Sequence, residues 1–175
     1  LKDMMRICEL SGESSDKYER LYEEQKEAVN TKAWDGEWFR RAIMDNGRYL
    51  GSKAEPQAKI WLNSQTWSVI SGMAEGEKGK TAMQSVYDLL NTEMGIKKID
   101  PSIENYPSKE DPLTNYSKGC GENGAVFCHA NTWAIIAECM LGRADRAYKY
   151  YRQLLPMIAQ KTAGEERYRA EPYVY

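Results

Sequence analysis

Apolar residues recur every three or four positions along three stretches of this chain, which is the spacing of helices that bury one face. The first stretch covers residues 1–30 and contains a turn at Gly12. The second covers residues 66–90 and the third residues 132–155. In each of these two, an apolar run is followed by a glycine turn and an amphipathic return. The pattern therefore predicts three helical hairpins.

The second and third hairpins repeat each other at an offset of 66 residues. Three features recur: the pairs Thr66-Trp67 and Thr132-Trp133, the turn glycines Gly76 and Gly142, and the leucines Leu89 and Leu155. Repetition of one helical pair is typical of folds in which a single pair cannot bury its own apolar face. The first helix of each repeat is the more apolar, so we expect it to form an inner layer, with the charged return helix facing water.

Inner and outer helices of this kind predict an all-α fold, either an α/α toroid or an open solenoid. A closed toroid of six hairpins needs about twice as many as this chain has, so residues 1–175 are expected to form about half of an (α/α)6 toroid. Two segments interrupt the helices. Asn46-Gly47 predicts the turn of a small β-hairpin insertion over residues 38–52, and residues 95–131 are predicted to form a long loop.

Composition excludes several classes of partner. The formal charge of −2 provides no broad basic surface, so we expect no nucleic acid partner. No apolar run approaches the roughly 20 residues of a membrane-spanning helix, and no signal peptide is visible. The four cysteines are irregularly spaced and the chain has one histidine, so we predict no metal site and reduced thiols in a cytoplasmic protein. Leu1 lies inside an amphipathic pattern, and we expect the natural N-terminus to lie elsewhere.

The single histidine, His129, lies in the stretch GENGAVFCHANTW, residues 121–133. At the repeat offset it takes the place of Asn63, in the loop that leads to the inner helix expected to begin at Thr132-Trp133. Free backbone N–H groups and the helix dipole favour an anion at such a place, and an imidazole adds a further hydrogen-bond donor. The alternative is that His129 caps the helix or packs against Trp133.

A carboxylate and an amide precede the histidine in a turn formed by Glu122-Asn123-Gly124. Carboxylate, amide and imidazole groups beside aromatic rings suit the recognition of sugar hydroxyls. Aromatic residues are available nearby or at the C-terminus of the sequence: Tyr116, Trp133, Tyr173 and Tyr175. Glu122 therefore predicts a sugar contact, although a solvated carboxylate in a turn is the alternative.

Asp35 and Glu37, in AWDGEWFRRA, form a second acidic pair. Asp-Gly is typical of a helix end, so we interpret this pair as structural, with Trp34 and Trp38 buried under the hairpin. An inverting glycosidase needs two carboxylates on opposite sides of the sugar, and nothing in the sequence identifies such a pair.

Several long motifs resemble one known family. ENGAVFCHANTW, GRADRAYKYY and YRAEPYVY, with AWDGEWFRRA and IWLNSQTWSVISG upstream, are similar to the C-terminal part of the catalytic domain of the inverting β-glycoside phosphorylases. This family includes the cellobiose, chitobiose and laminaribiose phosphorylases, and the resemblance spans nearly the whole chain. It implies an (α/α)6 barrel and cleavage of a β-linked disaccharide or short oligosaccharide by inorganic phosphate, giving an α-sugar 1-phosphate, with no cofactor and with a homodimeric parent.

The resemblance also implies roles for particular residues. His129 falls on the family's phosphate-binding histidine, and Glu122 and Tyr116, with Asn123 beside them, fall on the acceptor-sugar side. Many relatives have Lys before the Glu-Asn-Gly run, where this chain has Gly121, so the acceptor preference is open. The family's general acid, an Asp in a Trp-Asn-Asp motif, is expected upstream of Leu1. We therefore expect no catalytic residue in this chain and no activity from the chain alone.

Two other functions are compatible with the helical pattern. A helical-repeat interaction module binds a partner on its concave face without chemistry, and ADRAYKYYRQLLP resembles such repeats locally. The β-hairpin and the long loop argue against it, because both are uncommon in plain solenoids. A glycoside hydrolase on the same toroid is the third possibility, and the phosphate requirement of turnover distinguishes it.

Overall fold

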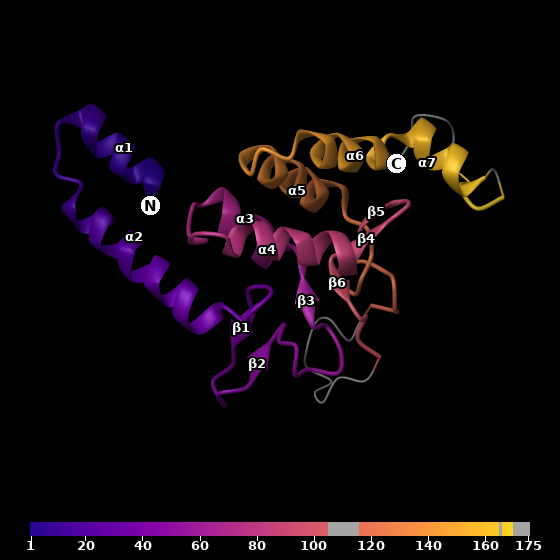
Figure 1. Ribbon diagram of the computed structural model, residues 1–175, viewed down its shortest axis with the longest axis horizontal. Helices are drawn as coiled ribbons and strands as arrows, with labels where there is room; N and C mark the ends of the chain where they lie inside the picture. The colour runs from indigo at the N-terminus through magenta and orange to yellow at the C-terminus, as the bar shows by residue number, and fades with distance from the viewer. Residues whose placement is uncertain (105–115, 165, 170–175) are drawn as a thin grey trace.

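The computed structural model describes residues 1–104, 116–164 and 166–169 (Figure 1). Most of the described elements are helical. The helices are α1 (Lys2–Ser11), α2 (Asp16–Ala28), α3 (Leu62–Ile70), α4 (Lys78–Ser85), α5 (Cys128–Met140), α6 (Ala144–Leu154) and α7 (Pro156–Ala163). Two π-helical segments, η1 (Val29–Ala33) and η2 (Val86–Leu90), continue α2 and α4. None of the helices in the described part of the chain is long and apolar enough to cross a membrane.

Within the described residues, six short strands pair into small antiparallel sheets. The strands are β1 (Ala42–Ile43), β2 (Tyr49–Leu50), β3 (Ile60–Trp61), β4 (Asn91–Thr92), β5 (Gly95–Ile96) and β6 (Ile99–Asp100). β1 pairs with β2 and β4 pairs with β5, each across a local turn, whereas β3 pairs with the distant β6. The β1–β2 pair is the hairpin predicted within residues 38–52. Residues 105–115 of the predicted 95–131 loop lie outside the described residues.

The helices form the three predicted hairpins, α1–α2, α3–α4 and α5–α6, and the described chain closes no ring. The prediction of a mostly α-helical part of a toroid with a small β insertion is confirmed. α7 was not predicted as a separate helix; it begins at Pro156, which follows an extended Leu155. Proline at the first helical position favours a new helix start rather than a continuation of α6.

The repeat at offset 66 is visible in the helix boundaries. α3 begins at Leu62 and α5 at Cys128, and the return helices begin at Lys78 and Ala144. The inner helices therefore start four residues before the predicted Thr-Trp positions, and that boundary prediction was wrong. The reason is local, because a threonine hydroxyl can bond a carbonyl within its own helix. Thr132 Oγ1 donates to the carbonyl of His129 at 2.6 Å, and Thr66 Oγ1 to that of Asn63 at 3.3 Å.

The apolar helices α3 and α5 pack directly against each other, as expected of an inner layer. Alanines make up much of the α5 face that is fully buried, and small side chains let two helix backbones approach closely. The alanines on this face are Ala130, Ala134 and Ala137. The outer helices are joined instead by long polar side chains: Arg146 donates to Gln84 at 2.9 Å, and Lys149 donates to the hydroxyl of Tyr87 at 2.7 Å. The inner helices therefore pack more closely against each other than the outer helices do.

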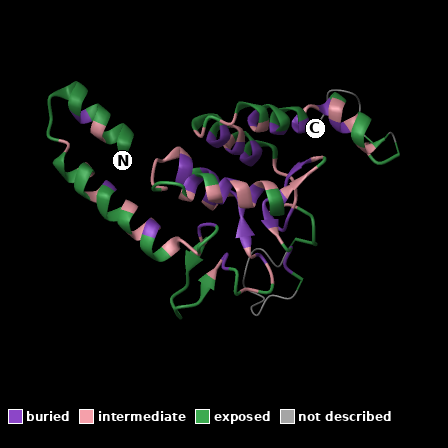
Figure 2. Cartoon of the chain, viewed as in Figure 1, coloured by how far each residue is buried: buried purple, intermediate pink, exposed green. Residues whose placement is uncertain are grey.

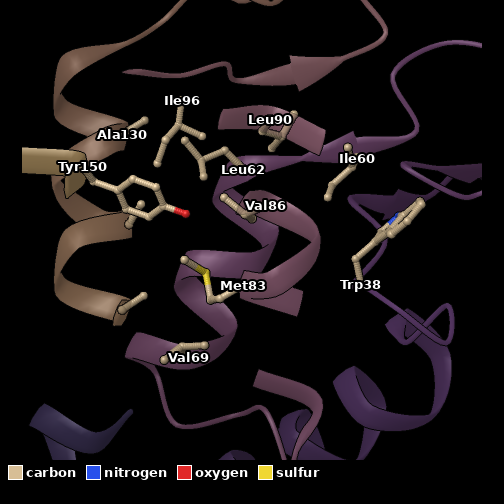
Figure 3. Close-up of a cluster of buried hydrophobic side chains, with 12 residues drawn as sticks. Trp38, Ile60, Leu62, Val69, Met83, Val86, Leu90, Ile96, Ala130 and Tyr150 are labelled. Carbon is tan, nitrogen blue, oxygen red and sulfur yellow. The ribbon is translucent and has the colours of Figure 1, made fainter. Parts of the chain in front are cut away.

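The main core lies between α3, η2, α5 and α6 (Figure 3). Its side chains come from both repeats and from the strands that precede the inner helices. The labelled members are Trp38, Ile60, Leu62, Val69, Met83, Val86, Leu90, Ile96, Ala130 and Tyr150. Burial of this apolar surface is the dominant favourable contribution to folding, so the core fixes the two repeats relative to one another.

The first hairpin projects from this core and is mostly exposed (Figures 1 and 2). Polar contacts connect it to the turn that follows α3. The hydroxyl of Tyr22 donates to the carbonyl of Gly72 at 3.0 Å, and the amide of Asn30 donates to the carbonyl of Met73 at 2.7 Å. Cys8 and Tyr22 are buried, whereas Leu10 is 73% exposed. The apolar pattern of α1 is therefore only partly buried within the described residues.

Candidate functional site

Two irregular connections, one from η1 to α3 and the other from η2 to α5, lie at the same end of the helices. Each leaves the C-terminus of an outer helix through a tight turn, closed by the bridge Trp34–Phe39 in one case and by the pair Asn91–Ile96 in the other. Each then runs to the N-terminus of an inner helix, α3 or α5. The β3–β6 pairing joins the two connections into one layer. The β-hairpin and the described part of the long loop are thus equivalent insertions of the repeat, over the N-termini of the inner helices.

Two buried amides hold these connections to the inner helices. Gln65 and Asn131 are 0% exposed and occupy equivalent positions in α3 and α5, 66 residues apart. The side chain of Gln65 accepts from the backbone N–H of Phe39 at 2.8 Å and donates to its carbonyl at 2.9 Å. Asn131 makes the same pair of bonds with Ile96, at 2.7 and 2.9 Å. Each amide also donates to the carbonyl four residues earlier in its own chain segment.

His129 is exposed and lies in the first turn of α5, not in the loop before it. Its ring meets Phe127 and Trp133 edge to face, with ring centroids 4.7 and 4.8 Å apart and interplanar angles of 74° and 86°. Trp133 in turn contacts Trp67, its equivalent in α3, at 5.2 Å. The helix begins at the N-cap Phe127 without a side-chain cap. The exposed imidazole is therefore held between two rings at a helix N-terminus that has no side-chain cap.

Glu122 lies on the same layer and forms an ion pair with Lys98. The side chain of Glu122 is 39% exposed, whereas that of Lys98 is 10% exposed. The Lys98 ammonium also lies 4.6 Å from the centroid of the Phe127 ring, within the range of a cation–π interaction. Lys98 and Phe127 thus connect Glu122 with His129, and the structure brings these two predicted residues into one row of side chains.

Asn123 and Tyr116 shape the turn that carries Glu122. Asn123 is 1% exposed, accepts from the N–H of Ile103 at 2.7 Å, and donates to the carbonyls of Ile103 and Tyr116 at 2.8 and 3.0 Å. This engagement with the backbone favours a role in holding the loop, and sugar binding by Asn123 itself stays a prediction. Tyr116 is 46% exposed and its ring lies against Gly121, which has φ of +50°.

Asp35 has the structural role expected for it. Its carboxylate pairs with Arg40 and accepts hydrogen bonds from the Ser52 hydroxyl at 3.0 Å and from the backbone N–H of Lys53 at 2.7 Å. These contacts fasten both ends of the β1–β2 hairpin to the turn after η1. Trp38 is buried at 5% exposure, and its indole N–H donates to the carbonyls of Gly51 and Lys59.

A cavity of about 580 Å³ lies elsewhere, along α4. Apart from Leu89, the described residues that line it are charged or polar and none is aromatic; they include Glu77, Lys80, Gln84 and Arg143. Sugar sites combine hydrogen-bonding groups with apolar and aromatic surface. The row around His129 meets that requirement and the cavity along α4 does not, so we assign the candidate site to the inner-helix N-termini.

The helical hairpins have an apolar inner layer, and an imidazole, a carboxylate and aromatic rings lie over the N-termini of the inner helices. These features define a protein of the α/α-toroid class with a site suited to an anion and a sugar. The chain belongs to the glycosyl hydrolase 94 superfamily: the model of its catalytic domain matches residues 1–175. The predicted membership of the β-glycoside phosphorylase family is confirmed.

Curated relatives support this membership. The chain is 38% identical to a solabiose phosphorylase of Paenibacillus borealis over 86% of its length, and 35% identical to an N,N'-diacetylchitobiose phosphorylase of Vibrio proteolyticus over 100%. It is 34% identical to a cellobionic acid phosphorylase of Neurospora crassa over 86%. The matches cover 19%, 22% and 20% of these three proteins, so the chain spans about a fifth of the length of the relatives.

Sequence reasoning missed Lys98, Phe127 and the two buried amides. A signal for the amides was present, since Gln65 and Asn131 directly precede the two Thr-Trp pairs and extend the repeat by one position. No comparable signal pointed to Lys98. It is one of two adjacent lysines, and only tertiary structure distinguishes the buried one from its neighbour.

Proposed function

We propose that the protein containing this chain is an inverting β-glycoside phosphorylase. It cleaves a β-linked disaccharide or short oligosaccharide with inorganic phosphate and releases an α-sugar 1-phosphate. The proposal is supported by the family match over residues 1–175 and by three relatives from different organisms, each named as a phosphorylase of a different sugar. Because the chain covers about a fifth of those relatives, the activity is assigned to the longer protein.

The observation that carries the proposal is the placement of His129. An exposed imidazole in the first turn of the 13-residue helix α5, fixed edge-on between Phe127 and Trp133, presents a hydrogen-bond donor beside free helix N–H groups. The positive end of the helix dipole favours an anion at this point. Phosphate bound there is itself an anionic nucleophile, so the reaction needs no second carboxylate to activate water.

The remaining parts of the proposed site follow from the family. Glu122 and Tyr116, with Asn123 holding their turn, contribute to the acceptor-sugar side. An Asp upstream of Leu1 protonates the glycosidic oxygen while phosphate attacks the anomeric carbon from the other face. No metal or organic cofactor takes part, and inorganic phosphate is the co-substrate. We further propose a cytoplasmic location and a homodimeric parent.

The first test compares two samples for release of sugar 1-phosphate from β-linked disaccharides: the longest polypeptide that the gene encodes and the 175-residue chain. The longer protein is expected to be active only with phosphate, and the chain alone inactive. Turnover of the longer protein without phosphate would support the hydrolase instead. Turnover by the chain alone would place the general acid within it and overturn that part of the proposal.

The second test is His129→Ala in the longer protein, with Cys128→Ala as a neighbour control in the same helical turn. Loss of a hydrogen bond to a charged ligand corresponds to a fall of about 10- to 100-fold in kcat/KM for phosphate. The control is expected to leave that value within about twofold. Unchanged phosphate dependence in His129→Ala would remove the imidazole from the phosphate site.

A further inference from the structure

The backbone of Lys98 is fixed at the junction between the two inner helices. The N–H of Leu62, the first residue of α3, donates to the carbonyl of Lys98 at 2.9 Å. On the other side, the N–H of Lys98 donates to the carbonyl of Ala125 at 3.0 Å, three residues before α5 begins. The position of Lys98 therefore depends on both repeats, and any shift between them moves this residue.

The side chain of Lys98 is more deeply buried than that of the adjacent Lys97. The side chain of Lys98 is 10% exposed, whereas that of Lys97 is 29% exposed and pairs with Asp100. Burying an ammonium is costly unless it is paired, because the charge loses its hydration. A long lysine stem usually keeps its charge in water. Lys98 instead directs its charge inward, onto Glu122 and the face of Phe127.

These contacts leave part of Glu122 available to a ligand. Lys98 bonds Oε2 of the carboxylate, and within the described part of the chain Oε1 has no hydrogen-bond partner. A carboxylate oxygen has two acceptor sites, so the free oxygen can accept from a sugar hydroxyl while the bonded one fixes the plane of the group. The half-exposed Tyr116 ring lies on the same turn and offers the apolar surface that a sugar ring packs against.

We propose that Lys98 is the positioning residue of the acceptor side of the site. It holds the Glu122 carboxylate in the orientation that receives an acceptor hydroxyl, and it fixes Phe127, whose ring contacts His129. Lys98 touches neither sugar nor phosphate. This inference rests on the proposed phosphorylase function, and it adds the residue that sets the distance between the acceptor and phosphate sides.

The test uses the longest polypeptide that the gene encodes and measures KM and kcat in both directions of the reaction. The variants are Lys98→Met, Lys98→Arg, Glu122→Gln and the double variant Lys98→Met/Glu122→Gln, with Lys97→Met as the matched control. Methionine keeps the length and apolar stem of lysine and removes the charge. Thermal unfolding of every variant is recorded in parallel, so that a loss of folding is recognised as such.

We expect Lys98→Met to raise KM for the acceptor sugar about 10- to 100-fold, the effect of losing a charged hydrogen bond, with KM for phosphate changed less than threefold. Glu122→Gln is expected to give a similar loss, and the double variant no more than either single one, because the residues act as a unit. Lys98→Arg is expected to recover part of the acceptor binding, since it restores the charge.

Three results would overturn the proposal about Lys98 in an active enzyme. The first is the same KM for the acceptor in Lys98→Met and Lys97→Met, and the second is a loss of acceptor binding in the double variant equal to the sum of the single losses. The third is an equal rise in KM for sugar and for phosphate in Lys98→Met, with a matching fall in thermal stability. The last result indicates a purely structural lysine. Absence of phosphorolysis in the unmodified protein is a different outcome, because it removes the proposed function rather than the role of Lys98 within it.

Discussion

Replacing Asn131 by leucine tests how the long loop is held to α5. The side chain of Asn131 is 0% exposed and makes three hydrogen bonds, two of them with the N–H and carbonyl of Ile96, which is also 0% exposed. Leucine is similar in size and branching but can neither accept nor donate. The variant therefore leaves two buried backbone groups of β5 without these partners.

The magnitude follows from those two groups. A buried polar group left without its partner costs about 1–3 kcal/mol, so the loss of both partners in Asn131→Leu should lower the free energy of unfolding by about 2–6 kcal/mol. The third bond adds little to this loss, because the carbonyl of Phe127 also accepts from the backbone N–H of residue 131 at 3.1 Å. For a chain of 175 residues, 1 kcal/mol corresponds to about 2–4 °C in the melting temperature, so Tm of this chain should fall by about 4–24 °C.

Two measurements check this expectation. Thermal unfolding followed by circular dichroism gives the loss in Tm, with Thr132→Ala, an exposed neighbour in the same helix, as the control that should stay within about 2 °C. Hydrogen exchange of the Ile96 amide gives the local effect, since its N–H donates to Asn131 and should exchange faster in the variant. A variant with the Tm and Ile96 exchange of the unmodified protein would show that this amide does not hold β5.

Two further predictions follow from Gly121 and Glu138. Gly121 and Gly119 both have positive φ, but a Cβ at Gly121 would lie 2.6 Å from the Tyr116 ring and one at Gly119 would meet nothing within 4 Å. Gly121→Ala should therefore displace the ring and raise KM for the acceptor about tenfold, and Gly119→Ala should not. Equal effects of the two alanines would indicate backbone strain alone. Burial raises the pKa of Glu138 above its ordinary value of 4.5, against the opposing pull of Arg146 and Arg143. The folded state therefore holds this proton more tightly, and the stability that Glu138 contributes is full below pH 4.5 and is lost as pH rises through the raised pKa. Urea unfolding at a series of pH values should show this fall in the unmodified protein and not in Glu138→Gln, and parallel curves would contradict it.

The sequence by itself determined the helical hairpins, the repeat and the family, because each depends on order along the chain. Apolar spacing marks a helix, an offset of 66 residues pairs equivalent positions, and long motifs such as ENGAVFCHANTW identify relatives. It also predicted His129 and Glu122 as site residues, and their roles stay predictions. The sequence analysis placed the starts of the inner helices four residues too late. A threonine that begins a helix and one that bonds to a carbonyl inside it, as Thr66 and Thr132 do, cannot be told apart from the sequence.

Only the tertiary structure decided how the site is held together. Asn131 and Ile96 are 35 residues apart, Lys98 and Glu122 are 24 apart, and the number of residues between such partners reflects loop length rather than chemistry. Lys97 and Lys98 are identical in type and adjacent in sequence. The side chain of Lys97 is 29% exposed and pairs with Asp100, whereas that of Lys98 is 10% exposed and lies against a carboxylate and an aromatic ring. Burial depends on which surfaces meet when the two repeats pack, and that is a property of the folded chain.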